Sequence, residues 1–142
     1  MAKSLWNDNL SVGVPLIDDQ HKMLLKHLAE FSEAVASHHG PSEIAGTLDF
    51  LVGYMDFHFK TEEKHMAANE YPGLEMHLKE HVKFTATLAS LGEDFQEEGA
   101  TPSLAEAINT LLINLFLKHI EVVDQKLGAF FLKKGAVLKD ES

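Results

Sequence analysis

The chain has 142 residues and a formal net charge of −10, with 12 basic against 22 acidic side chains. Its length suits one domain, and 45% hydrophobic with 24% charged residues is the balance of a globular protein that can bury a core. The negative charge disfavours nucleic acid and anionic membranes as partners, and the lack of cysteine excludes disulfides, iron–sulfur clusters and thiol catalysis.

Residues 1–17 mix polar and apolar side chains, and we expect them to form an N-terminal arm that Trp6 anchors onto the rest of the protein. A helix is predicted over about 18–38, because apolar residues then recur at steps of three and four and Asp18 or Asp19 can cap its start. Its apolar stripe consists of Ile17, His21, Leu24, Leu28, Phe31 and Val35. A histidine therefore lies in line with the core.

A second helix is predicted over about 42–67, after Gly40 and Pro41 end the first and Ser42 caps the next. Its stripe consists of Ile44, Leu48, Leu51, Met55, His58, Glu62 and His65. A third helix is predicted over about 73–97, following the proline of the NEYPG segment and closed by Gly99. Its stripe consists of Leu74, His77, His81, Phe84, Leu88, Leu91 and Phe95.

A fourth helix is predicted over about 102–127, with Thr101 as its cap and Pro102 in its first turn. Its stripe consists of Leu104, Ile108, Leu112, Leu115, His119 and Val122. In the tail, 129–142, we expect Phe130, Phe131 and Leu132 to pack on the helices and the last residues to fray.

These elements predict an all-α protein, an up-down-up-down antiparallel four-helix bundle with an N-terminal arm, formed as a single domain over 1–142. Antiparallel packing brings the starts of the first and third helices to the same end as the ends of the second and fourth. The ligand-type residues that converge there are His21, His58, Glu62, His77, His81, His119 and Asp124. One histidine on an apolar face is usually a satisfied core residue, but this set from four helices is improbable by chance.

The spacing within this set suits metal binding for all but one pair. The pairs on the second and third helices are four residues apart and so share a helix face. Asp124 follows His119 by five residues, which in an ideal α-helix separates them by about 140° around the axis. A side-on bridging carboxylate or a local distortion of the helix would reconcile this pair. No lysine or arginine shares the stripe of Glu62, so a cation is the simplest compensation for burying its charge.

Five imidazoles and two carboxylates exceed the four ligands of a tetrahedral zinc ion, so either two ions bind or several ligands are idle. Mixed imidazole and carboxylate ligation fits iron, with manganese or zinc as alternative occupants in vitro. The sequence therefore indicates a histidine-rich metal site with room for two ions.

Four segments of the chain resemble the hemerythrin family, and its single-domain bacterial members most closely. They are VGVPLIDDQHKML around His21, HFKTEEKHM around His58, YPGLEMHLKEH around His77 and HIEVVD around His119, and they lie within residues 6–127. The resemblance implies two iron ions joined by an oxo or hydroxo bridge. One iron would be completed by His77, His81 and His119, and the other would be held by His21 and His58 with a vacant position for O2. Glu62 and Asp124 would bridge the two.

An apolar pocket for O2 is expected beside the ligands. Its candidate lining is Leu24, Leu25, Phe59, Leu115 and Ile120, for all of which plain core packing is an equally compatible role. Many relatives carry tryptophan at the position of Leu115, so the smaller side chain here would open the pocket.

We therefore predict reversible O2 binding, for transport, storage or delivery, by a cytoplasmic protein that is not an enzyme. The preponderance of imidazoles over carboxylates favours this over a carboxylate-rich oxidase, because neutral imidazoles stabilise Fe(II) better than carboxylates do. The alternatives are a di-iron enzyme that reduces peroxide or nitric oxide, and an oxygen or redox sensor that acts through a separate partner. O2 is the expected ligand, with no nucleic-acid or membrane partner, and the chain is expected to be a monomer or weak oligomer.

Other polar residues are expected to lie outside the chemistry. His65 continues the stripe beyond Glu62 but is expected to be partly solvated. Those expected on the surface are His27, His38, His39, Glu63 and Lys64.

Overall fold

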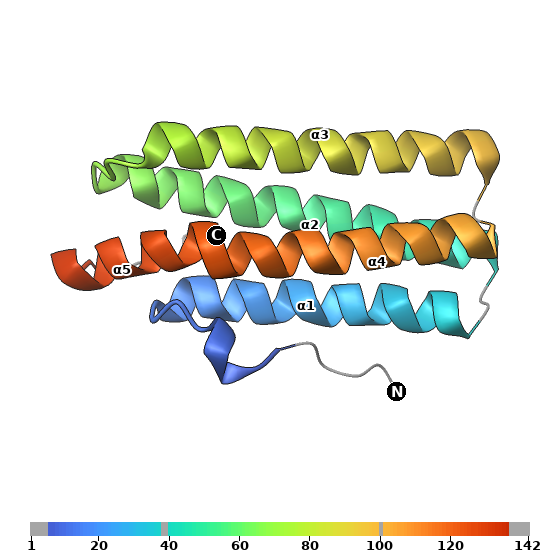
Figure 1. The fold of residues 1–142 in the computed structure, drawn as a ribbon, viewed down its shortest axis with the longest axis horizontal. Coiled ribbons are helices and arrows are strands. Elements are labelled where there is room, and N and C mark those ends of the chain that lie inside the picture. Colours follow the sequence, from blue (N-terminus) through green and yellow to red (C-terminus); the bar gives the residue numbers. More distant parts are fainter. Residues whose placement is uncertain (1–5, 38–39, 100, 137–142) are drawn as a thin grey trace.

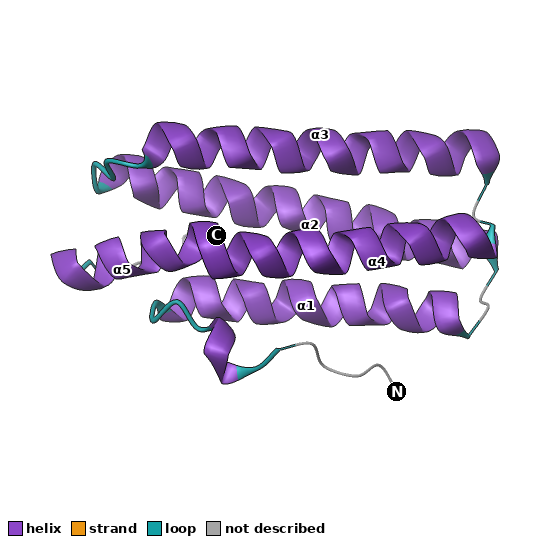
Figure 2. Cartoon of the chain, in the orientation of Figure 1, coloured by secondary structure: helices purple, strands orange, loops and turns teal. Residues whose placement is uncertain are grey.

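The computed structural model describes residues 6–37, 40–99 and 101–136. Across these residues the chain consists of helices, turns and loops, without a strand (Figure 2). The elements are η1 Asp8–Leu10, α1 Pro15–Ala36, α2 Pro41–Ala68, α3 Leu74–Glu98, α4 Pro102–His119, η2 Ile120–Asp124 and α5 Gln125–Lys134. Among the described helices, none is both long enough and apolar enough to cross a lipid bilayer.

The four long helices alternate in direction and pack side by side (Figure 1). α1 contacts α2 and α4, and α3 also contacts both of these helices, so the four form a closed ring around one core. The predicted antiparallel all-α bundle is confirmed. The fourth helical rod is longer than predicted, because η2 and α5 continue α4 to Lys134.

The helix ends follow the local chemistry of the sequence. Proline stands in the first turn of α1, α2 and α4, where a helical N–H has no partner to lose. Thr101 caps α4 as predicted, its side-chain oxygen accepting the Leu104 N–H at 3.3 Å. Gly99 ends α3 with φ 76°, a conformation that an L side chain rarely adopts.

Asp18 does not cap α1, because the helix begins earlier, at Pro15. Its carboxylate instead accepts hydrogen bonds from the Ser11 hydroxyl at 2.6 Å and from the Val12 N–H at 2.8 Å. The side chain therefore holds the N-terminal arm against the start of the helix.

The main core lies between the four helices and is built largely from the predicted stripes. A second apolar cluster lies at the end where the arm and α5 meet, and it consists of Val12, Val14, Ile17, Met66, Leu127 and Phe131. Gly128 is part of this contact, since a Cβ at that position would overlap the carbonyl oxygen of Val12. The arm is thus packed onto the bundle, and Trp6 contacts the main core as predicted.

Several predicted surface or core positions lie elsewhere. Val122 is 48% exposed and Leu132 is 59% exposed, so neither is a core residue, whereas Phe131 is buried and Phe130 is partly buried. His27 is partly buried beside the ring of Phe50, with 4.5 Å between ring centroids. His38, His39 and the tail beyond 136, for which surface positions and fraying were predicted, lie outside the described residues.

Candidate metal centre

The predicted ligand residues all lie in the interior at one end of the bundle. α1 contributes His21, α2 contributes His58 and Glu62, α3 contributes His77 and His81, and the fourth rod contributes His119 and Asp124. None of them is more than 5% exposed. The antiparallel arrangement thus brings together all seven residues that were predicted from the sequence as metal ligands.

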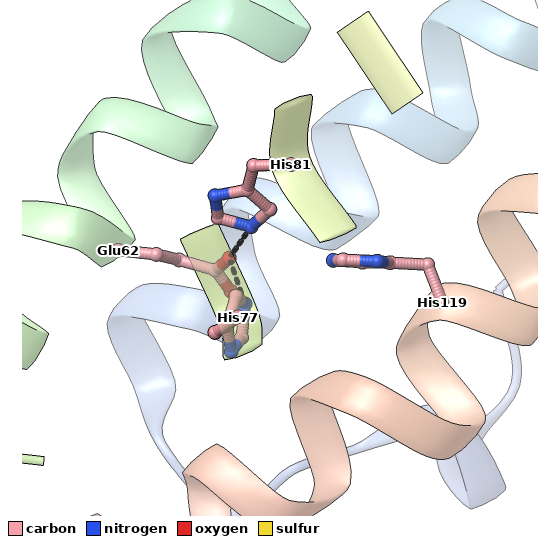
Figure 3. A group of neighbouring side chains, drawn as sticks. All are labelled: Glu62, His77, His81 and His119. Carbon is pink, nitrogen blue, oxygen red and sulfur yellow. Dashed lines mark hydrogen bonds and ion pairs between the residues drawn. The ribbon is translucent and has the colours of Figure 1, made fainter. Parts of the chain in front are cut away.

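Glu62 lies between two groups of histidines, and Figure 3 shows it beside the first group, His77, His81 and His119. Its Oε1 lies 3.0 Å from Nε2 of His81 and 3.3 Å from Nε2 of His77. Its Oε2 lies 3.4 Å from Nε2 of His58 and 3.9 Å from Nε2 of His21. Each carboxylate oxygen of Glu62 therefore lies close to a different pair of imidazoles.

The two carboxylate oxygens of Asp124 also face different histidines. Its Oδ1 lies 3.2 Å from Nε2 of His77 and 3.4 Å from Nε2 of His119, while its Oδ2 lies 2.9 Å from Nε2 of His21. Two sets of donor atoms result, each within 4.8 Å of one another: Glu62, His77, His81 and His119 form one, and His21, His58, Glu62 and Asp124 form the other. Two carboxylates thus stand between two positions for a cation.

A short π-helical segment explains how Asp124 reaches this site. Residues Ile120–Asp124 form a π turn, in which the N–H of Gln125 bonds to the carbonyl of Ile120, five residues back. The wider turn brings residues five apart onto one face, and His119 and Asp124 accordingly point at a common region. The local helix distortion that the five-residue offset required is present.

The tautomers of two histidines follow from their Nδ1 contacts. His58 Nδ1 lies 2.7 Å from Oε1 of Gln20, and His81 Nδ1 lies 2.8 Å from Oε2 of Glu63. Both partners accept, so each Nδ1 donates its proton, and Nε2 of a neutral ring keeps a lone pair. These lone pairs face carboxylate oxygens, which also only accept.

A metal ion fits this arrangement. Among the described residues, Nε2 of four histidines and three carboxylate oxygens make no hydrogen bond despite their short separations: His21, His58, His77 and His119, with Glu62 Oε2 and both oxygens of Asp124. Ligand atoms about 2.1 Å from a shared ion and at right angles to each other stand about 3 Å apart, close to the separations found here. The donor atoms are therefore placed to face common points rather than one another.

The charges of the site are strongly coupled. Burial lowers the pKa of His77, but its contacts with Asp124 and Glu62 outweigh burial and raise the pKa to about 9. The pKa of His119 is raised because Asp124 likewise outweighs burial, whereas burial prevails at His58 and lowers its pKa. Burial raises the pKa of each carboxyl, yet the imidazoles prevail and hold the pKa of Glu62 and Asp124 below the usual range. Both carboxylates therefore stay ionised and attract positive charge.

Sequence reasoning missed two residues behind the ligands. Glu63 was assigned to a solvated face, but its carboxylate reaches inward to His81, and only 33% of its side chain is exposed. Gln20 is buried beneath His58. Glu63 is one position after Glu62 and lies off the predicted stripe, so only the length of its side chain could have suggested the contact. Gln20 follows Ile17 by three residues and precedes Leu24 by four, so helical spacing already places it at the edge of the stripe.

The surroundings of the site are apolar. Four of the five candidate pocket residues are buried, namely Leu24, Leu25, Phe59 and Ile120. Phe59 stacks on the ring of His81, with 3.9 Å between centroids and 13° between planes. Phe116, which the sequence did not single out, is buried with its ring 5.7 Å from that of His21 in an edge-on arrangement.

Leu115 has a different setting from the other candidates. It is partly buried and lines a cavity of about 360 Å³ between α3 and α4, together with Phe84 and the ligand candidate His119. Lys83 and Lys118 also border this cavity. His65, by contrast, belongs to neither set of donors and is partly exposed, as predicted.

Comparison with known proteins gives a consistent result. Residues 12–131 match the family described as the hemerythrin HHE cation binding domain. A bacteriohemerythrin of Methylococcus capsulatus is 30% identical over 131 residues, covering 90% of this chain and 96% of that protein. A myohemerythrin of Riftia pachyptila is 31% identical over 122 residues, covering 86% and 88%. A wild-type hemerythrin crystal structure aligns with a TM-score of 0.78 at 27% identity, over 90% of this chain and 97% of the other. The family match spans all of the candidate ligands.

Proposed function

Because this chain belongs to the hemerythrin family, we propose that it binds dioxygen reversibly, as a carrier, store or delivery protein and not as an enzyme. Two iron ions would be held by the buried histidines and the two shared carboxylates. Bound there, a ferrous pair supplies the two electrons that reversible dioxygen binding requires.

The unequal histidine content of the two sets of donors supports this proposal most directly. Three imidazoles, from His77, His81 and His119, serve one position, and two, from His21 and His58, serve the other. Since Asp124 also faces His77 and His119, the first position has five protein ligands and the second has four, so the second is the one that can accept a small exogenous molecule. Neutral imidazoles also add no negative charge, which favours a low oxidation state of iron.

The apolar surroundings support binding without further reaction. Leu24 and Leu25 follow His21 by about one helical turn, and both are fully buried. The buried ring of Phe116 also packs edge-on against His21. Excluding water and mobile protons from this space disfavours the loss of reduced oxygen and so favours release of O2.

The test is a cycle between air and argon. Protein loaded anaerobically with ferrous iron should develop new absorption bands on exposure to O2 and lose them under argon, over several cycles. His58→Ala should abolish the cycle, while the matched variant His65→Ala, which removes an imidazole from the same helix outside both sets of donors, should retain it. A single irreversible change in the wild-type spectrum would contradict the proposal.

A second candidate, reduction of peroxide or nitric oxide, is favoured by the cavity between α3 and α4, which gives outside molecules access to the edge of His119. Steady-state consumption of either substrate with an electron donor would support it. Stoichiometric reaction without turnover would exclude it.

A further inference from the structure

One histidine of each group donates a hydrogen bond from Nδ1, and the two acceptors differ in charge. His81, which belongs to the group of three, donates through Nδ1 to the carboxylate of Glu63 at 2.8 Å. His58, which belongs to the group of two, donates to the neutral amide oxygen of Gln20 at 2.7 Å. The hydrogen bonds are equally short, so the difference between them is one negative charge.

The face of the His81 ring also carries a stacked aromatic ring, whereas the ring of His58 makes edge-on and tilted contacts. Phe59 stacks on the face of His81, Glu62 lies at Nε2 and Glu63 lies at Nδ1. The ring of His58 instead meets Phe59 at a tilt of 44°, with centroids 5.9 Å apart. The direction of the His81 lone pair is thus set from three sides.

A carboxylate that accepts from Nδ1 makes the opposite nitrogen a stronger electron donor, because it stabilises positive charge on the ring. An amide does the same to a smaller degree. The effect is larger for a metal ion of higher charge, since more electron density is drawn from the ligand.

We propose that Glu63 is a positioning residue that makes the two metal positions unequal, so that the position served by His77, His81 and His119 binds its ion more tightly and better stabilises the ferric state. This inference rests on the proposed di-iron function. The ion beside His81, which Glu63 supports, would be the one that is retained. The ion beside His58, which Gln20 supports, would be the one that exchanges with the surroundings.

The experiment is an anaerobic titration of the metal-stripped protein with Fe(II) against a competing chelator. Wild type should bind two ions in separate steps. Glu63→Gln keeps the accepting oxygen but removes the charge, and it should weaken the first step by about tenfold, the lower end of the usual effect of such outer residues. Glu106→Gln, an equal change of charge on an exposed residue of α4, should alter neither step.

Two further measurements separate charge from geometry. The reduction potential of the more tightly bound ion should rise in Glu63→Gln, because the ferric ion loses more affinity than the ferrous ion; a tenfold difference between these two losses corresponds to ~59 mV for one electron. Gln20→Glu places a carboxylate behind His58 and should strengthen the second step, bringing the two steps together. This variant tests the idea even where Glu63→Gln fails to fold.

The outcomes distinguish this inference from the function on which it rests. Two-step binding that is identical in wild type, Glu63→Gln and Gln20→Glu would overturn the role of Glu63 and leave the proposed function intact. A wild-type protein that binds fewer than two ions would overturn the shared metal site itself. If two ions bind in the expected two steps but the absorption bands do not cycle between air and argon, reversible oxygen binding alone would be overturned.

Discussion

Stripping the metal from this protein should make its stability fall as the pH rises from 6.5 to 9. The reason is His77, which stands between two buried carboxylates that hold its pKa at about 9 in the folded chain, compared with 6.5 for an ordinary histidine. Below pH 6.5 the residue is protonated in both the folded and the unfolded chain, and its attraction to the carboxylates contributes fully. Above pH 6.5 only the folded chain keeps the proton, so stability declines with pH.

The magnitude follows from the pKa difference. Each unit corresponds to ~1.36 kcal/mol, so the shift at His77 amounts to ~3 kcal/mol across the interval. His119, whose pKa is also raised, adds to the decline. His58 has a lowered pKa and therefore contributes in the opposite direction, but its effect is largely complete above pH 6.5.

The assay is urea unfolding followed by circular dichroism at a series of pH values in this interval. The free energy of unfolding of stripped wild type should fall, and His77→Gln, which cannot take up the proton, should show a shallower slope. Metal-loaded protein should respond with the opposite sign, because imidazoles must lose their protons to bind metal and affinity therefore increases with pH. Stability of the stripped protein that is constant or rises over this range would refute the reasoning.

Three other changes test separate parts of the structure. His77→Ala should lose bound iron and lower the melting temperature, because metal binding is coupled to folding; full iron content by elemental analysis would contradict its role as a ligand. Gly128→Ala should destabilise the protein by ~1–3 kcal/mol in chemical unfolding, since the added methyl overlaps the backbone of the arm at Val12; an unchanged midpoint would mean that the arm moves aside freely. Leu115→Trp should fill much of the cavity of about 360 Å³ beside His119 and slow irreversible oxidation in air several-fold; an unchanged rate would exclude this cavity as the route of attack.

The bundle and most of the candidate site could be predicted from the sequence because a regular helix converts spacing into direction. His58 and Glu62, like His77 and His81, are four residues apart, and the alternating direction of the helices brings them to the same end. Asp124 could not be placed by this rule. Its position depends on the π turn, which no periodic pattern in the sequence marks, and only the resemblance to a family suggested it.

Other differences have the same physical origin. Val122 would lie in line with His119 in a regular helix, but the π turn rotates it into solvent. Glu63 lies beside the buried face of α2 rather than on it, and its long side chain bends back to His81. Helix periodicity predicts where a side chain starts, whereas contacts made by its far end depend on the neighbouring helix.

The π turn also shifts the spacing of buried residues along the fourth rod, so the buried positions before and after it do not follow one continuous α-helical repeat. Before it, the buried face carries Leu112 and Phe116; after it, the buried face carries Leu127 and Phe131, which pack against the N-terminal arm. The π turn holds one extra residue, so forcing Ile120–Asp124 into a regular α-helix without removing a residue would rotate everything downstream by about 100° relative to the upstream face. Deleting one residue between His119 and Asp124 would instead leave the two four apart on one α-helical face and keep the downstream direction. Such a deletion should therefore be tolerated better than an insertion of one residue, which would turn Asp124 away from the histidines and Leu127 and Phe131 away from the arm together.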